Sequence, residues 1–206
     1  MERLAACPVE GPDKKRRGVR EWWVVDRKDQ GDSPKAPLTL IITSDQHDFV
    51  VYSLDRREVA WGAGHKRPDA VLVANLGTTH LVCFIEMKST MKGDSAVYQK
   101  ALAQLRSGVD HFCPAGRRGS TRVHGDEHHD RWRDGDDLIE VMPSANHVVC
   151  GVCVVLRQAP PRPLPQRDRI SGKDVDFLLL SVPAEGFNRA RLTLEALCYK
   201  LGVSLP

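Results

Sequence analysis

Two short motifs carry the residue types that can do metal chemistry. Pro68 and Asp69 come just before one apolar run. Glu86, Met87 and Lys88 end the next apolar run. Mg²⁺ binds oxygen ligands and commonly takes one or two protein carboxylates together with several waters. Such an ion polarises a phosphate oxygen and lowers the pKa of an attacking water, and a nearby lysine can assist that water. The motifs therefore predict a site for phosphodiester hydrolysis.

Two strands are needed to bring these motifs together. Residues 70–74 and 81–85 are rich in Val, Leu and Ile, and a short glycine-containing segment separates them. This pattern predicts a β-hairpin. Because side chains alternate across a strand, the two charged residues of the second motif project from the same face. Pairing of the strands would bring Asp69, at the open end of the hairpin, close to Glu86 and Lys88.

A helix is expected directly after the hairpin. Its apolar residues recur three, four and seven positions apart, so one stripe should face a core. Gln104 lies on one border of this stripe and Gln99 on the other. The predicted helix is Ser95–Phe112, and its stripe is Tyr98, Ala101, Leu102, Leu105, Val109 and Phe112.

Residues 67–112 together resemble the PD-(D/E)XK, or restriction-endonuclease-like, nuclease superfamily. A proline followed by Asp69 matches the first half of its motif, and Glu86, Met87 and Lys88 match the second. The resemblance implies an α/β fold with a mixed sheet flanked by helices. It also implies a Mg²⁺ site, in which Mn²⁺ can substitute, held by Asp69 and Glu86. Lys88 would assist the attacking water, and we place Met87 among the metal contacts as well.

The resemblance also gives a role to a polar residue of the helix. Superfamily members often carry a Gln or Lys there that touches the scissile phosphate or a metal-bound water. Gln104 and Gln99 are the candidates, and an ordinary polar helix flank is the alternative for each. These folds usually open with a helix that bears another acid, whereas residues 20–60 here are predicted mainly as strands. Glu58 or Glu21 could be that acid, and no pattern selects one.

The same motifs also have a purely structural interpretation. A Glu-Lys pair can end a core hairpin, and Asp69 can be a turn residue after a proline. The chain would then be a non-catalytic module of the same fold that binds nucleic acid or protein. The complete set of Asp69, Glu86 and Lys88 favours the enzyme, since a degenerate copy has no reason to retain all three.

Length and charge limit the function classes. The 206 residues suit one domain with a substantial core, and the net charge of +3 is compatible with nucleic acid. We expect a flexible basic arm over residues 1–20 and a single domain over 21–206. No apolar run approaches the roughly 18 residues of a membrane span, so we expect a soluble, cytoplasmic protein. Further strands are predicted at 22–25, 38–43, 49–54, 147–156 and 175–182, and a final helix at 188–201.

Basic residues just before the first motif and in a later charged loop are the natural phosphate contacts if the partner is nucleic acid, for which DNA is the first candidate. They are Lys66, Arg67, Arg117, Arg118 and Arg122. The last three belong to residues 114–137, a predicted loop rich in Arg, His, Asp and Gly. Cutting both strands of a duplex requires two sites and one domain supplies one, so we expect a homodimer.

Cysteines and histidines offer a different metal chemistry. Cys150 and Cys153 are three residues apart in a predicted strand, so they should point to opposite faces and cannot share a metal. His124 and His128 could bind zinc if they were helical, but the glycines and charges around them predict a loop. A zinc-stabilised interaction protein is therefore the weakest of the three hypotheses.

Overall fold

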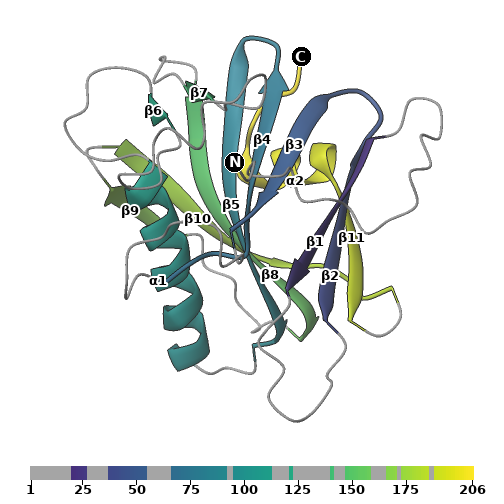
Figure 1. The fold of residues 1–206 in the computed structure, drawn as a ribbon, viewed down its shortest axis with the longest axis vertical. Coiled ribbons are helices and arrows are strands. Elements are labelled where there is room, and N and C mark those ends of the chain that lie inside the picture. The colour runs from purple at the N-terminus through teal and green to yellow at the C-terminus, as the bar shows by residue number, and fades with distance from the viewer. Residues whose placement is uncertain are drawn as a thin grey trace, which may run out of the picture.

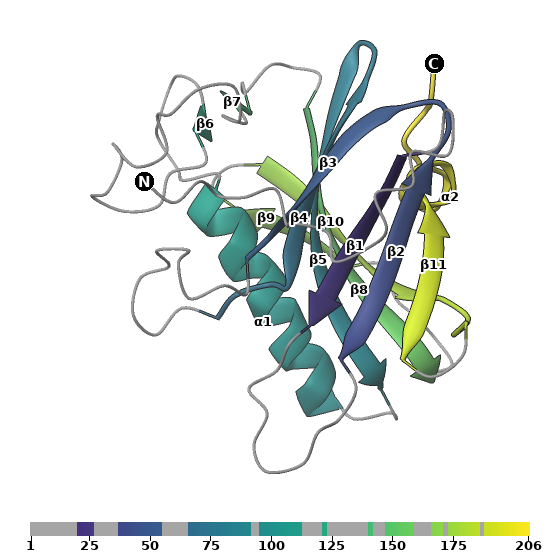
Figure 2. The ribbon, with the colours of Figure 1, turned by 45° about the vertical axis from the view of Figure 1, so that its right-hand side comes forward.

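The chain folds as a mixed α/β protein built in layers. Helix α1 (Ser95–Phe112) covers one face of a six-stranded sheet, and a three-stranded sheet covers the other (Figure 1). Figure 2 shows these outer layers on opposite sides of the larger sheet. The computed structural model describes residues 20–26, 37–54, 66–91, 95–112, 121–122, 140–141, 147–158, 166–170, 173–185 and 188–206.

The six-stranded sheet contains both parallel and antiparallel neighbours. Its first three strands form an antiparallel meander, after which β8 runs parallel to β5 and β10 runs parallel to β8. Helix α1 lies in the connection from β5 to β8, where a parallel pair needs a long crossover. The spatial order is β3 (Asp48–Ser53), β4 (Ala70–Leu76), β5 (Thr79–Thr90), β8 (His147–Gln158), β10 (Lys173–Ser181) and β9 (Gln166–Ile170).

The three-stranded sheet joins segments from both ends of the described chain. Strand β2 (Leu38–Ser44) lies between β1 (Arg20–Asp26), which is antiparallel to it, and β11 (Arg189–Thr193), which is parallel. Helix α2 (Leu194–Leu201) follows β11 directly. Two short strands, β6 (Thr121–Arg122) and β7 (Glu140–Val141), pair separately.

Strand β5 lies between two hydrophobic cores. Cys83, Ile85 and Met87 belong to the core shared with the three-stranded sheet and α2. Val82 and Phe84 belong to the core under α1. Because successive side chains point to opposite faces, this strand is buried on both sides. The second motif is therefore in the interior of the molecule.

The predicted hairpin and helix are confirmed. Strands β4 and β5 pair antiparallel with Ala70 opposite Ile85, and the turn is shorter than expected, only Gly77 and Thr78. Gly77 has a φ of 76° and Thr78 a negative φ, the pattern of a type II′ hairpin turn. Helix α1 has the predicted bounds. The other five predicted strands are also present, as β1, β2, β3, β8 and β10.

The final helix was predicted too long. Its first half is β11, in which Ala190 is buried and Arg189 and Arg191 are exposed, a period of two. The edge of β2 supplies backbone hydrogen bonds to this segment. The helix starts at the next residue, Leu194, where the hydroxyl of Thr193 caps it by accepting a hydrogen bond from the amide of Ala196. Strand β9 was not predicted, because its centre is charged; an edge position tolerates such residues.

Two predicted segments fall largely outside the described residues. Of the basic arm over 1–20, only Arg20 is described, as the first residue of β1. Of the charged loop over 114–137, only Thr121 and Arg122 are described, in β6. None of the helices in the described ranges combines the length and the apolar character needed to cross a membrane.

The cysteine prediction is confirmed for the strand pair. Cys150 lies in the core between the sheets and Cys153 in the core under α1, so the two thiols are on opposite faces of β8. Cys198 of α2 is buried in the same core as Cys150. Burial raises the pKa of the Cys198 thiol from 9.0 to about 11, and Cys150 adds to the shift.

This pKa shift predicts a loss of stability in alkali. As the pH rises past 9.0, the thiol of Cys198 ionises in the unfolded chain but stays protonated in the folded chain until the pH reaches about 11. The unfolded state then binds fewer protons, so the free energy of unfolding falls across this interval. Urea midpoints measured from pH ~8 to pH ~11 should fall less in Cys198→Ala than in the unaltered protein. Equal falls would contradict the assignment.

Candidate active site

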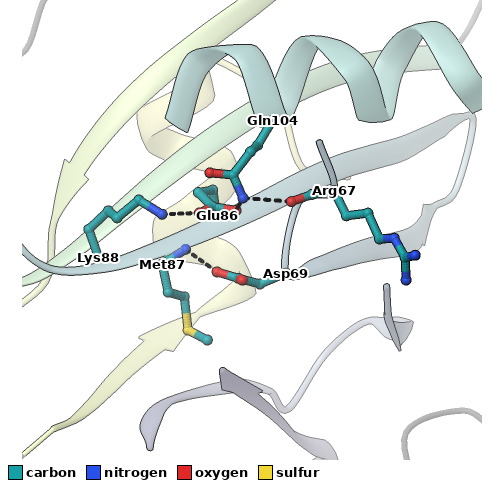
Figure 3. Close-up of polar contacts among 6 residues, drawn as sticks. All are labelled: Arg67, Asp69, Glu86, Met87, Lys88 and Gln104. Carbon is teal, nitrogen blue, oxygen red and sulfur yellow. Dashed lines mark hydrogen bonds and ion pairs between the residues drawn. The ribbon is translucent and has the colours of Figure 1, made fainter. Parts of the chain in front are cut away.

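The two motifs meet at the open end of the β4–β5 hairpin (Figure 3). The last pair in the ladder is Ala70 opposite Ile85. The next facing positions on the two strands are therefore Asp69 and Glu86. Both carboxylates are buried, with 6% and 0% of the residue exposed respectively. The predicted proximity of the two motifs is confirmed.

Glu86 is held through both of its carboxylate oxygens. Oε1 pairs with the Nζ of Lys88, which projects from the same face of β5. Oε2 accepts a hydrogen bond of 3.0 Å from Nε2 of Gln104 on α1. A buried carboxylate is stable only when it is paired or hydrogen-bonded. Lys88 and Gln104 supply both kinds of partner.

Asp69 completes the end of the β-ladder with its side chain. Its Oδ2 accepts a hydrogen bond of 2.5 Å from the backbone amide of Met87. The described ladder between β4 and β5 ends at Ala70, so the carboxylate takes the place of a strand partner for this buried amide. The backbone carbonyl of Asp69 accepts from the amide of Leu54 at 3.0 Å, which ties the same residue to the end of β3.

Helix α1 contacts both halves of the site. Besides Glu86, Nε2 of Gln104 donates to the backbone carbonyl of Arg67 at 2.7 Å. One turn later, Gly108 allows close approach: a Cβ there would lie 2.8 Å from Cγ of Pro68 and 2.9 Å from Cδ1 of Phe84. Oε1 of Gln104 is buried without a hydrogen-bond partner among the described residues.

The structure separates the two glutamine candidates. Gln104 is in the cluster, whereas Gln99 is on the exposed side of α1. Met87 lies between Glu86 and Lys88, but its side chain is buried in the core on the other face of β5. Only the backbone of Met87 faces the site, and its amide already binds Asp69.

The donor set fits a hard divalent ion. The two carboxylates are oxygen donors, which suit Mg²⁺ and Mn²⁺. Asp69 and Glu86 would hold the ion. Across the described ranges, no group of three or more His, Cys, Asp or Glu side chains could hold a metal. Waters and substrate oxygens would have to complete the ligands, which is usual for Mg²⁺.

The candidate upstream acid Glu21 is not part of this cluster. Its carboxylate accepts hydrogen bonds from Nε1 of Trp23 at 2.5 Å and from Nη1 of Arg191 at 3.1 Å. Val24 of the same strand points into the core between the sheets, so Glu21 faces the opposite side. The other candidate, Glu58, lies outside the described residues.

The basic candidates are only partly described. Lys66 is exposed and Arg67 is half-buried, immediately before the first motif. The Arg67 side chain extends away from the carboxylates (Figure 3). Arg122 lies in β6, while Arg117 and Arg118, like His124 and His128, lie outside the described residues.

Two features of the site were missed in the sequence. The capping of the Met87 amide by Asp69 and the close approach at Gly108 depend on the packed structure. Of these features, only the close approach at Gly108 could have been recognised in the sequence, because a glycine inside a predicted helix often marks close packing.

Comparison of the chain with protein-family models, with curated proteins and with solved structures found no match. The case for a function therefore depends on the geometry of the site.

Replacing Asp69 should destabilise the protein, because the backbone amide of Met87 loses the carboxylate that accepts its hydrogen bond. Asp69→Ala leaves the buried amide of Met87 without its acceptor, which costs about 1–3 kcal/mol of unfolding free energy. Asp69→Asn keeps an oxygen in place and should lose less. The exposed Asp174 provides the control Asp174→Asn, expected to change stability by no more than about 0.5 kcal/mol. Equal stability of all three variants in urea denaturation would contradict the capping role.

The ion pair of Glu86 and Lys88 predicts strong coupling between them. Lys88→Met leaves a buried carboxylate without its cation and should cost about 3–5 kcal/mol. The double variant Glu86→Gln/Lys88→Met carries no charge at either of these two positions. The side-chain amide oxygen at position 86 can still accept the hydrogen bond from Gln104, so much of the lost unfolding free energy should be recovered. A double-mutant cycle of urea denaturation measures this coupling. Additive losses would show that the two side chains do not act as a pair.

Proposed function

We propose that this chain is a Mg²⁺-dependent nuclease of the PD-(D/E)XK type that hydrolyses phosphodiester bonds, with DNA as its substrate. The observation that carries the proposal is the convergence of Asp69, Glu86 and Lys88 at the open end of one hairpin, with Gln104 of the following helix beside them. The mixed sheet, with α1 between the parallel strands β5 and β8, agrees with the restriction-endonuclease-like fold that the motifs imply.

Each residue of the cluster has a role in this proposal. Asp69 and Glu86 hold the ion, which would polarise the phosphate and lower the pKa of the attacking water when bound. The ammonium of Lys88 lies at the Glu86 carboxylate, where it can hold that water and offset negative charge that develops on the phosphate. Oε1 of Gln104, for which the described part of the chain offers no donor, can accept a hydrogen bond from the water.

The proposed enzyme binds DNA, forms a homodimer and acts in the cytoplasm. Lys66 and Arg67 precede the site and would bind the phosphate backbone, so DNA affinity should weaken with salt. A homodimer would supply the two sites that cleavage of a duplex requires. A cytoplasmic role in repair, recombination or defence against foreign DNA suits such an enzyme.

One observation favours a second function. All three charged residues of the site also have structural partners: the Met87 amide for Asp69, and each other for Glu86 and Lys88. A non-catalytic module that binds nucleic acid or protein could keep these contacts for stability alone. Activity separates the two candidates.

The nuclease proposal predicts metal-dependent cleavage that is lost in matched variants. The purified protein should cut DNA with Mg²⁺ or Mn²⁺ and stop when a chelator is added. Asp69→Asn and Glu86→Gln should lower both metal affinity and rate, the rate by about 100-fold or more. Lys88→Gln keeps a donor to Glu86, so it should bind metal while its rate falls by about 100-fold.

The substrates are single-stranded, duplex and branched DNA and RNA. Asp174→Asn is the control, because this carboxylate is exposed on β10, and it should cut at the normal rate. A protein inert on all four substrates with Mn²⁺ present would favour the non-catalytic module instead. Cleavage of RNA alone would correct the substrate while leaving the site intact.

A further inference from the structure

The amide of Gln104 connects two segments that are distant in sequence. Nε2 donates to the backbone carbonyl of Arg67 at 2.7 Å and to Oε2 of Glu86 at 3.0 Å. An amide nitrogen carries two hydrogens, so both donors are used. Arg67 lies two residues before Asp69, whereas Glu86 lies on the neighbouring strand. One side chain of α1 thus holds both halves of the site.

These two hydrogen bonds also fix the orientation of the amide. Since both acceptors are oxygens, only the nitrogen end of Gln104 can face them, and Oε1 must point elsewhere. Lys88 holds the other oxygen of Glu86, so the carboxylate is restrained from two directions. Gly108 keeps the helix close enough for these contacts, because a Cβ there would overlap Pro68 and Phe84.

We propose that Gln104 is a positioning residue that sets the affinity of the site for a divalent ion by holding Glu86 and the Arg67 backbone in fixed relation. The inference rests on the proposed function, because it concerns the same two carboxylates. It goes further in assigning the effect to the nitrogen end of the amide, which need not touch the ion, the water or the substrate.

The physical reason is the strict geometry of a small divalent ion. Mg²⁺ requires near-ideal octahedral angles, so carboxylates that shift relative to each other bind it poorly. Without Gln104, Glu86 loses the hydrogen bond on its Oε2, and the segment before Asp69 loses its hydrogen bond to α1. Loss of such an outer partner typically weakens metal binding about 10–100-fold.

The opposite effect is the rival expectation. A donor on Oε2 of Glu86 withdraws charge from the carboxylate, and its removal would then tighten metal binding. The sign of the change in affinity therefore distinguishes positioning from competition for the same oxygen.

The test is a calorimetric titration of the purified full chain with Mn²⁺. Gln104→Met keeps the length of the side chain and removes both donors together with Oε1, and it should weaken Mn²⁺ binding by about 10-fold or more. Gly108→Ala leaves every polar group in place, Oε1 of Gln104 included, but pushes α1 away from Pro68 and Phe84, so weaker binding in this variant assigns the effect to position. Gln99→Met, on the exposed side of the same helix, is the control and should bind normally.

A second measurement reports on the site without metal. The amide of Met87 is held by Asp69, so its hydrogen exchange measures whether the carboxylate stays in place. Exchange at Met87 should accelerate in Gln104→Met, while the amides of β10 exchange at their normal rate. A contact that only stabilised the fold would accelerate both sets of amides together.

The outcomes separate this inference from the proposed function. Unchanged or tighter Mn²⁺ binding by Gln104→Met overturns the positioning role while the metal site stands. Absence of Mn²⁺ binding by the unaltered protein overturns the metal site itself. In that case the exchange at Met87 decides whether Gln104 holds the two segments, and an unchanged rate there overturns this role as well.

Discussion

The burial of the Glu86 carboxylate is the constraint on which the rest of the site depends. The residue exposes none of its surface, and an unpaired buried carboxylate is strongly unfavourable. Lys88 can pair with it because residues two apart on a strand share a face. Gln104 can reach it only because Gly108 lets α1 lie close to the hairpin. The ion pair within β5 and the close packing of α1 therefore both stabilise the buried carboxylate of Glu86.

Stability alone is a weak explanation for this arrangement. Replacing a buried ion pair with apolar side chains of similar volume is often neutral or stabilising. The surroundings of Glu86 on β5 are apolar: Val82 and Phe84 precede it on the same face and pack under α1. An apolar pair in place of Glu86 and Lys88 would extend that core. In the proposed nuclease these two charged groups have a chemical use, and their mutual pairing is the condition that lets them stay buried.

Local patterns predicted the frame of the site, and packing decided its details. Apolar runs and a turn glycine gave the hairpin, and strand alternation placed Glu86 and Lys88 on one face. The choice of Gln104 over Gln99 depends on how α1 is rotated against the sheet, which the width of an apolar stripe leaves open. The capping by Asp69 depends on where the β4 ladder ends. Strand β11 was mistaken for helix because Ala190 and Leu194 suit both periods, and pairing with β2 decided the outcome.

The three-stranded sheet, the part that departs most from the fold implied by the motifs, also contributes to the site. Met87 is fully buried in the core that this sheet forms with the larger one, where Leu40 and Ile42 of β2 lie. That packing fixes the backbone of β5 at the residue whose amide holds Asp69. The neighbours on either side of Met87 face α1 and pair with each other. The site is thus held from both faces of β5: the second sheet fixes the backbone that positions Asp69, and the helix fixes the side chain of Glu86.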